Sequence, residues 1–384
     1  MHGLYDGEFA GFKAASSEQL DAALRDAIVA VDANVLLDLY RFRPQTSQDL
    51  FTVLQKLGDR LVVPHQGLRE FWRRRQRTLD SPRRSTKEAA DALAKSGRSV
   101  CDALASWAKA VGVDEDELAG LTARVNGFVG ELRGELQAVL QDAGEERAMD
   151  PVLDRLEELL AGRVTLPLDQ EEWTACITEA NRRIDSEEPP GYLDADKGGS
   201  DLPEGGAGDY LVWYQATRYA REQDRDLLIV TRDEKEDWWW RQQSEFIGPR
   251  PELVLEYQAL SGRQLFLMRP LDLLRRAAVL GVRVDQASSA EVAAVADAER
   301  YPYVEDGTGR RYQRVSLTSA AAGRPALAYE WRGVQLPEGR CWKYTRENLE
   351  LMYEQGRIEF RRRGIPVGKR YLDERSGPSG NRPS

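Results

Sequence analysis

Short apolar segments rich in β-branched residues recur along this chain, and they restrict its fold more than any other feature. Each is bounded by polar or turn residues, as expected for strands buried in a parallel sheet. The segments are Ala27–Val31, Leu61–Val63, Leu227–Val230 and Leu265–Met268. Helical patterns separate them, so the sequence predicts an α/β fold.

A long stretch between the second and third segments, about Ser85–Asp185, shows helical periodicity and no strand signal. We expect a helical insertion there that projects from the α/β core or covers it. The chain has 384 residues, enough for two or three domains. The expected divisions are an α/β core in two parts (1–84 and 186–276), the insertion (85–185), a linker helix (277–300), a small basic C-terminal module (301–376) and a disordered tail (377–384).

Composition narrows the class of protein further. The 3 cysteines are far apart and follow no metal-binding spacing, so neither a disulfide framework nor a zinc site is indicated. No segment approaches the roughly 20 apolar residues of a membrane helix, and no secretion signal is visible, so we expect a cytoplasmic protein that does not interact with membranes. The net charge is -10, yet Tyr301–Ser384 holds 16 Lys and Arg against 10 Asp and Glu. That segment is the more basic, polyanion-facing part.

Acidic residues follow three of the four predicted strands. Asp32 ends the first strand, Asp233 follows the third, and Glu70 lies in a helix after the second. Asp209 opens the helix before the third strand. Because open α/β sheets place their sites at the carboxyl ends of the strands, these acids could converge on one edge. Taken singly, Asp209 also suits a helix N-cap and Asp233 a turn; taken together, they favour a site.

Crowded carboxylates repel one another unless cations neutralise them, and Mg²⁺ or Mn²⁺ is the natural match for oxygen ligands. Such a centre hydrolyses phosphodiesters by activating water and by binding the attacking and leaving oxygens. It needs no histidine, which suits a chain with 2.

Five motifs in this order carry a family resemblance: VDANVLLDLY, VVPHQGLREFW, PPGYLDADK, GDYLVWYQA and TRDEKEDWWW. They closely resemble the bacterial PIN-like nucleases that have a long helical insertion between the second and third acidic motifs, and the match spans about Ala27–Arg275. The resemblance implies a parallel sheet with helices on both faces, Mg²⁺ or Mn²⁺ dependence and endonuclease activity. By motif position it implies a role for Asp32, Glu70, Asp209 and Asp233 as metal-binding catalytic acids, with Asn34 and Thr231 orienting them.

Other polar residues near these motifs are open to two interpretations. Asp194 and Lys197 lie in the PPGYLDADK motif and could face the substrate phosphate. The basic run that includes Arg73 and Arg74 could guide a phosphate backbone to the site or could be a solvated helix face. The remaining nearby acids indicate solvated or helix-terminal charges: Asp38, Asp196, Glu234, Glu236 and Asp237. The three tryptophans at 238–240 favour core packing of at least one of them.

The C-terminal segment also resembles a known region. Matches at GRRY, EWRG, GRCWKYT, GRIEF and KRYLDE, within about Val304–Gly377, are similar to an accessory segment of type III restriction-modification adenine-specific DNA methyltransferases. We see no S-adenosylmethionine motif, so methyl transfer is not implied. Trp342, Lys369 and Arg370 combine aromatic and basic character, which indicates nucleic-acid binding or docking to a protein partner, although the aromatic residues also suit a small core.

Together these features predict a metal-dependent endonuclease that acts on nucleic acid, DNA or RNA undecided, in processing or in defence against foreign DNA. Two alternatives remain open. One is a catalytically inactive nucleic-acid-binding or partner-docking protein on a PIN-like scaffold. The fact that none of the four acid positions is replaced argues against it. The other is a toxin-like ribonuclease held in check by a partner.

Overall fold

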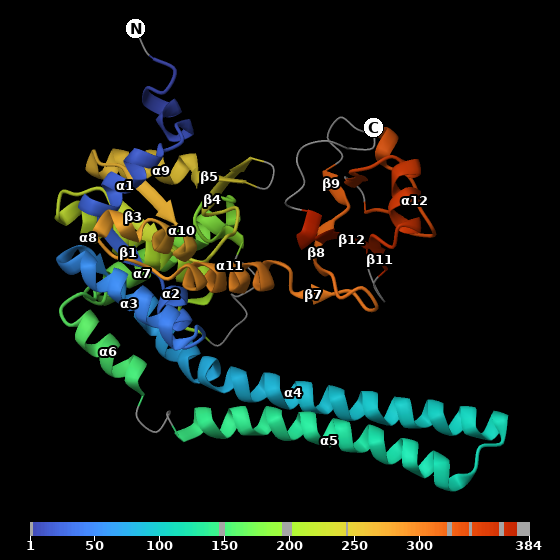
Figure 1. The fold of residues 1–384 in the computed structure, drawn as a ribbon. Helices are drawn as coiled ribbons and strands as arrows, with labels where there is room; N and C mark the ends of the chain where they lie inside the picture. The colour runs from blue at the N-terminus through green and yellow to red at the C-terminus, as the bar shows by residue number, and fades with distance from the viewer. Residues whose placement is uncertain are drawn as a thin grey trace. The chain divides into compact units, whose positions relative to one another are not determined.

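The computed structural model describes residues 3–145, 150–193, 202–242, 245–320, 325–337, 340–360 and 365–374. Asp194, Lys197 and the tail 377–384 lie outside these residues. The chain divides into two compact units, residues 1–289 and 290–384 (Figure 1). The division falls within helix α11 (Gln286–Arg300), in the stretch where the sequence indicated a linker helix.

A four-stranded parallel sheet forms the centre of the first unit. Its order is β2-β1-β3-β6, and every neighbouring pair is parallel. The strands are β1 (Ile28–Val31), β2 (Leu61–Val62), β3 (Leu227–Val230) and β6 (Leu265–Met268). The predicted α/β class with a parallel sheet is confirmed, because all four apolar segments form strands.

Helices cover both faces of this sheet. Alternate strand residues, among them Ile28, Ala30 and Ile229, pack in one core with helices α7 (Gln170–Asp185), α8 (Gly208–Glu222) and α9 (Pro251–Ser261). On the opposite face, α1 (Ser17–Asp26) contacts β3, and α3 (Pro44–Leu57) contacts α10 (Pro270–Arg275). This arrangement buries both faces of each strand, which explains why the strands are almost uniformly apolar.

Long helices occupy the stretch between β2 and β3. They are α4 (His65–Val111), α5 (Glu115–Glu145), α6 (Pro151–Leu160) and α7. Helix α4 begins beside the sheet and crosses position 84–85 without a break, then pairs with α5 as an antiparallel hairpin (Figure 1). The two helices approach closely at Gly97, where an added Cβ would lie 3.0 Å from Val129 Cγ2. The hairpin seam is therefore narrow at this point.

A two-stranded hairpin, β4 (Trp239–Gln242) and β5 (Glu245–Pro249), follows β3. Trp238 and Trp239 are buried, which confirms the interpretation that at least one tryptophan of this run packs in the core. Among the described residues, no helix is both long and apolar enough to cross a membrane.

The second unit has two small antiparallel sheets. Their orders are β11-β12-β8-β7 and β10-β9. Its core contains Leu317, Trp331, Trp342, Leu349 and Ile358. The elements are β7 (Tyr303–Val304), β8 (Arg311–Ser316), β9 (Thr318–Ala320), β10 (Arg340–Trp342), α12 (Arg346–Glu354), β11 (Ile358–Glu359) and β12 (Val367–Tyr371).

Candidate active site

Asp32 lies at the carboxyl end of β1, between β1 and the short helix α2 (Ala33–Asp38). Its Oδ2 accepts hydrogen bonds from Asn34 Nδ2 and Thr231 Oγ1, both at 2.9 Å. Burial raises the pKa of Asp32, and the negative charge of Asp233 raises it further, whereas the hydrogen bond from Thr231 and the positive charge of Arg74 lower it. Asn34 and Thr231 thus fix the orientation of a carboxylate whose charge is costly in the folded protein.

Asp233 and Asp209 are connected through one lysine. Asp233 forms the local turn that its sequence allowed, since its N–H donates to Thr231 Oγ1 at 2.9 Å and its Oδ1 accepts from the Lys235 N–H at 3.0 Å. The ammonium of Lys235 lies 2.7 Å from Asp233 Oδ2 and 3.0 Å from Asp209 Oδ2. Asp209, in the first turn of α8, also accepts from Trp238 Nε1 at 3.3 Å. Two carboxylates, one from the turn after β3 and one from the start of α8, therefore share a single cation.

Glu70 joins the same group from α4. Arg74, one turn further along the helix, lies 3.2 Å from Glu70 Oε2 and donates to Asn34 Oδ1 at 3.0 Å. A Cβ on Gly208 would meet Glu70 Oε1 at 2.9 Å, so Glu70 also lies against the start of α8. All four predicted acids consequently lie in one connected network at the carboxyl edge of the sheet.

The chemistry of this donor set fits a hard divalent cation, because all four side chains offer carboxylate oxygens. Within the described parts of the chain, however, no three His, Cys, Asp or Glu side chains are already gathered as a metal site. The ammonium of Lys235 and the guanidinium of Arg74 lie between the carboxylates instead. Direct coordination by three or more of these acids requires side-chain movement.

The two arginines that could guide a phosphate backbone or form a solvated helix face, Arg73 and Arg74, form ion pairs within the protein. Arg73 bonds with both oxygens of Glu204, one of them at 2.9 Å, and Arg74 bonds with Glu70 and Asn34. Glu204 is buried and also accepts from Gln66 Nε2 at 3.1 Å. No local pattern in the sequence points to Glu204, because its partners Gln66 and Arg73 come from α4, far away in the chain.

Asp38 and Asp237 are not solvated, because both are fully buried. Asp38 fits the other interpretation that the sequence left open, a helix-terminal charge, since it is the last residue of α2. Asp38 forms ion pairs with Arg232 at 2.9 Å and Arg41 at 3.5 Å. Asp237 Oδ2 accepts from the N–H groups of Gly191 and Leu193 at 3.0 and 3.4 Å. Asp237 therefore ties the loop that precedes residue 194 to the strand-end turn of Asp233.

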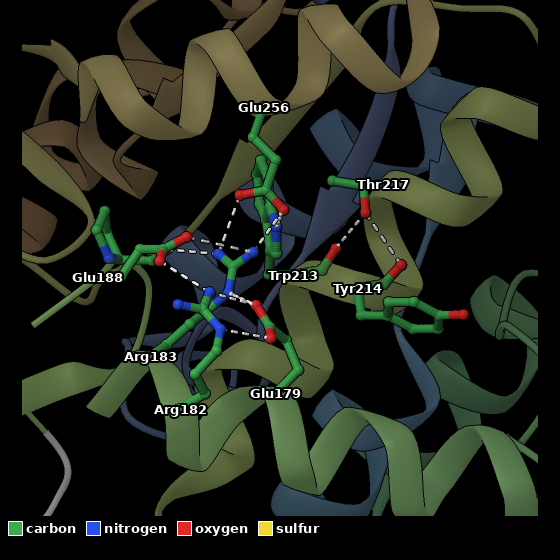
Figure 2. Close-up of polar contacts among 9 residues, drawn as sticks. Glu179, Arg182, Arg183, Glu188, Trp213, Tyr214, Thr217 and Glu256 are labelled. Carbon is green, nitrogen blue, oxygen red and sulfur yellow. Dashed lines mark hydrogen bonds and ion pairs between the residues drawn. The ribbon is translucent and has the colours of Figure 1, made fainter. Parts of the chain in front are cut away.

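The buried Arg183 lies beside this loop, with Glu179 and Glu256 around its guanidinium (Figure 2). Arg183 of α7 bonds with Glu179 at 2.8 Å, with both oxygens of Glu256 at 2.8 and 2.9 Å, and with the carbonyl of Pro189 at 2.7 Å. Two residues later, a Cβ on Gly191 would lie 3.3 Å from Asp209 Cβ, and the φ of +92° there favours glycine. Arg183 thereby supports the loop that packs on the candidate site.

The C-terminal residues singled out in the sequence have different surroundings. Trp342 is fully buried in the core of this unit, and its indole N–H donates to the Tyr329 carbonyl at 2.8 Å, which matches the alternative of a small aromatic core. Lys369 Nζ donates to Glu305 Oε1 at 2.7 Å. Arg370 is exposed and makes no ion pair within the part of the chain that the structure describes.

Comparison with known proteins gives one family match. Residues 28–253, more than half of the 384-residue chain, match the model of the family described as PIN-like domain. The matched range includes all four acid positions and ends before the C-terminal unit, where the methyltransferase resemblance stays a prediction. Neither the curated proteins nor the solved structures gave a match.

Proposed function

This chain belongs to the PIN-like domain family, whose members are usually nucleases, and from that membership we propose that it is a metal-dependent endonuclease. The reaction is hydrolysis of a phosphodiester bond in nucleic acid. Residues Asp32, Glu70, Asp209 and Asp233 would hold Mg²⁺ or Mn²⁺.

One observation carries this proposal. The four acids come from four separate segments, after β1, within α4, at the start of α8 and after β3, and they meet in one hydrogen-bonded network. A structural role would not require them to converge, because neighbouring carboxylates destabilise a fold unless cations neutralise them. Lys235 and Arg74 neutralise part of this negative charge, and a divalent cation would neutralise the rest.

The surrounding side chains prepare the acids for that ligand. When bound, Mg²⁺ or Mn²⁺ would supply an activated water and stabilise negative charge on the phosphate oxygens. Asn34 and Thr231 hold one oxygen of Asp32, so the other oxygen keeps a defined direction. Gly208 lets Glu70 approach the start of α8, since a side chain there would displace the carboxylate.

The C-terminal unit is better suited to docking than to broad phosphate binding. Several of its cations are held in ion pairs, among them Arg310 with Asp373, Arg314 with Glu359, and Lys369 with Glu305. A paired cation gains less from a phosphate, because it must first give up its carboxylate. We therefore assign this unit to binding a protein partner, with nucleic acid contacted mainly at the PIN-like domain.

The test is a cleavage assay with purified protein and labelled single- and double-stranded DNA and RNA. Each substrate is incubated with the wild type in the presence of Mn²⁺, Mg²⁺ or EDTA. The same reactions are run with the Asp32→Asn variant and, as a matched control, with Asp59→Asn. Asp59 is an exposed acid on the 3-10 turn Gly58–Arg60.

Internal cuts that need the metal, are lost in Asp32→Asn and persist in Asp59→Asn support the proposal. The cleavage rates on the four substrates show whether the enzyme prefers DNA or RNA. Cleavage of DNA favours the defence role, and cleavage of RNA favours the toxin-like role. Metal-dependent binding of nucleic acid without cleavage of any substrate would instead favour an inactive scaffold.

A further inference from the structure

Lys235 is the residue in the acid network that the sequence did not single out. Its ammonium lies 3.0 Å from Asp209 Oδ2 and 2.7 Å from Asp233 Oδ2. These two carboxylates belong to different elements, α8 and the turn after β3. One positive charge therefore joins the two sides of the site.

The surroundings of this ammonium are more protected than those of a surface ion pair. The side chains of Lys235, Asp209 and Asp233 are 28%, 20% and 16% exposed. Asp209 is also held by the indole N–H of Trp238, and Asp233 by the backbone N–H of Lys235 itself. The carboxylates are thus oriented independently of the ammonium, which adds charge neutralisation.

The position of the ammonium conflicts with a metal ion at the same place. A divalent cation that coordinates Asp209 and Asp233 needs oxygens at 2.0–2.1 Å for Mg²⁺, and an ammonium bonded to the same oxygens would repel it at short range. The two cations are therefore alternatives. This accounts for the lack, among the described residues, of a preassembled group of three acids.

From this geometry we infer that Lys235 is an internal counter-ion that a divalent metal has to displace before it can bind to Asp209 and Asp233. The inference rests on the proposed metal-dependent function. Metal binding to the free protein is therefore weak, because each binding event breaks the ion pairs of Lys235 with Asp209 and Asp233. It also keeps the carboxylates neutralised, and the site folded, while no metal is bound.

A purely structural lysine predicts a different behaviour. If Lys235 stayed between the two carboxylates after the metal had bound elsewhere in the network, removing its charge would have little effect on metal affinity. Calorimetric titration with Mn²⁺ alone separates the two cases without any measurement of cleavage.

The titration compares the full-length wild type with Lys235→Met, Lys235→Arg and Lys56→Met. Lys56 is an exposed lysine near the end of α3 and controls for the loss of one positive charge anywhere in the chain. We expect Lys235→Met to bind Mn²⁺ at least about ten times more tightly than the wild type, whereas Lys235→Arg and Lys56→Met stay within about twofold of it. Circular dichroism shows that each variant is folded, and Lys235→Gln replaces the Met variant if that one is not.

Equal Mn²⁺ affinity in the wild type and the charge-free variant would overturn the inference and leave the proposed metal site intact. Weaker binding in that variant would also overturn it, because Lys235 would then assist the metal. Absence of Mn²⁺ binding in every protein would refute the metal site itself, and the inference with it.

Discussion

Replacing Arg183 with Met should destabilise the first unit far more than the same change at the neighbouring Arg182. The side chain of Arg183 is 6% exposed, whereas that of Arg182 is 49% exposed, although both form ion pairs with Glu179. Methionine keeps the aliphatic part of the side chain and removes the guanidinium, whose central carbon lies 4.7 Å from the centre of the Tyr210 ring. The comparison therefore isolates the buried charge and its hydrogen bonds.

The magnitude follows from the contacts that are lost. Arg183→Met removes two charged hydrogen bonds to Glu256, one to Glu179 and one to the Pro189 carbonyl. Breaking a buried ion pair costs about 3–5 kcal/mol. Glu256 and Glu179 are 26% and 32% exposed, so water recovers part of their solvation and we expect about 2–4 kcal/mol. At about 2–4 °C per kcal/mol, Tm should fall by roughly 4–16 °C.

Differential scanning calorimetry of the two variants tests this value directly. Tm should fall by no more than about 2 °C in Arg182→Met, because exposed ion pairs contribute little. Equal shifts in the two variants would refute the reasoning from burial. Cleavage by Arg183→Met should also fall, since the loop at Pro189–Gly191 packs on Asp209.

The same cluster predicts a pH dependence. The hydrogen bonds from Arg182, and then those from Arg183, lower the pKa of Glu179 from 4.5 to about 2, against the opposing effect of burial. A carboxyl group whose pKa is lower in the folded protein contributes its full stabilisation at pH values above its pKa in the unfolded chain. That contribution is lost as the pH falls through its pKa in the folded protein. Arg182 still lowers the pKa of Glu179 in Arg183→Met, so only the contribution of Arg183 is missing there. The Tm difference between wild type and Arg183→Met should therefore narrow by that contribution between about pH 4.5 and pH 2. A difference that is constant over this range would contradict the assignment.

Three further substitutions test the site and the second unit. Asp32→Asn should abolish cleavage while Tm stays equal or rises, because burial and the charge of Asp233 already raise the pKa of this carboxyl; a large fall in Tm would indicate a structural role. Gly208→Ala should reduce cleavage by about tenfold or more with little change in Tm, because the new Cβ displaces Glu70, and an unchanged rate would argue against Glu70. Trp342→Ala should cost about 3–5 kcal/mol and unfold the second unit, which near-ultraviolet circular dichroism and limited proteolysis would detect.

The sequence by itself determined the α/β class, the four strands and the order of the acids. The reason is that a strand buried on both faces must be apolar throughout, and a polar residue directly after it must lie at the sheet edge. Asp32 and Asp233 could be placed in this way because Asp32 directly follows β1 and Asp233 follows the end of β3 after Thr231 and Arg232. Their proximity followed once the strands were taken as neighbours in a parallel sheet.

Only the tertiary structure decided which cations and loops surround those acids. Lys235 and Asp209 are 26 residues apart, and Arg183 and Glu256 are 73 apart, so no local periodicity links either pair. Asp237 likewise has a charged side chain that suits the surface, yet it is buried because packing supplies hydrogen-bond donors from the N–H groups of Gly191 and Leu193. Periodicity along a segment encodes which face is apolar, whereas charge pairing between segments depends on how the helices pack, and a single sequence does not encode that packing locally.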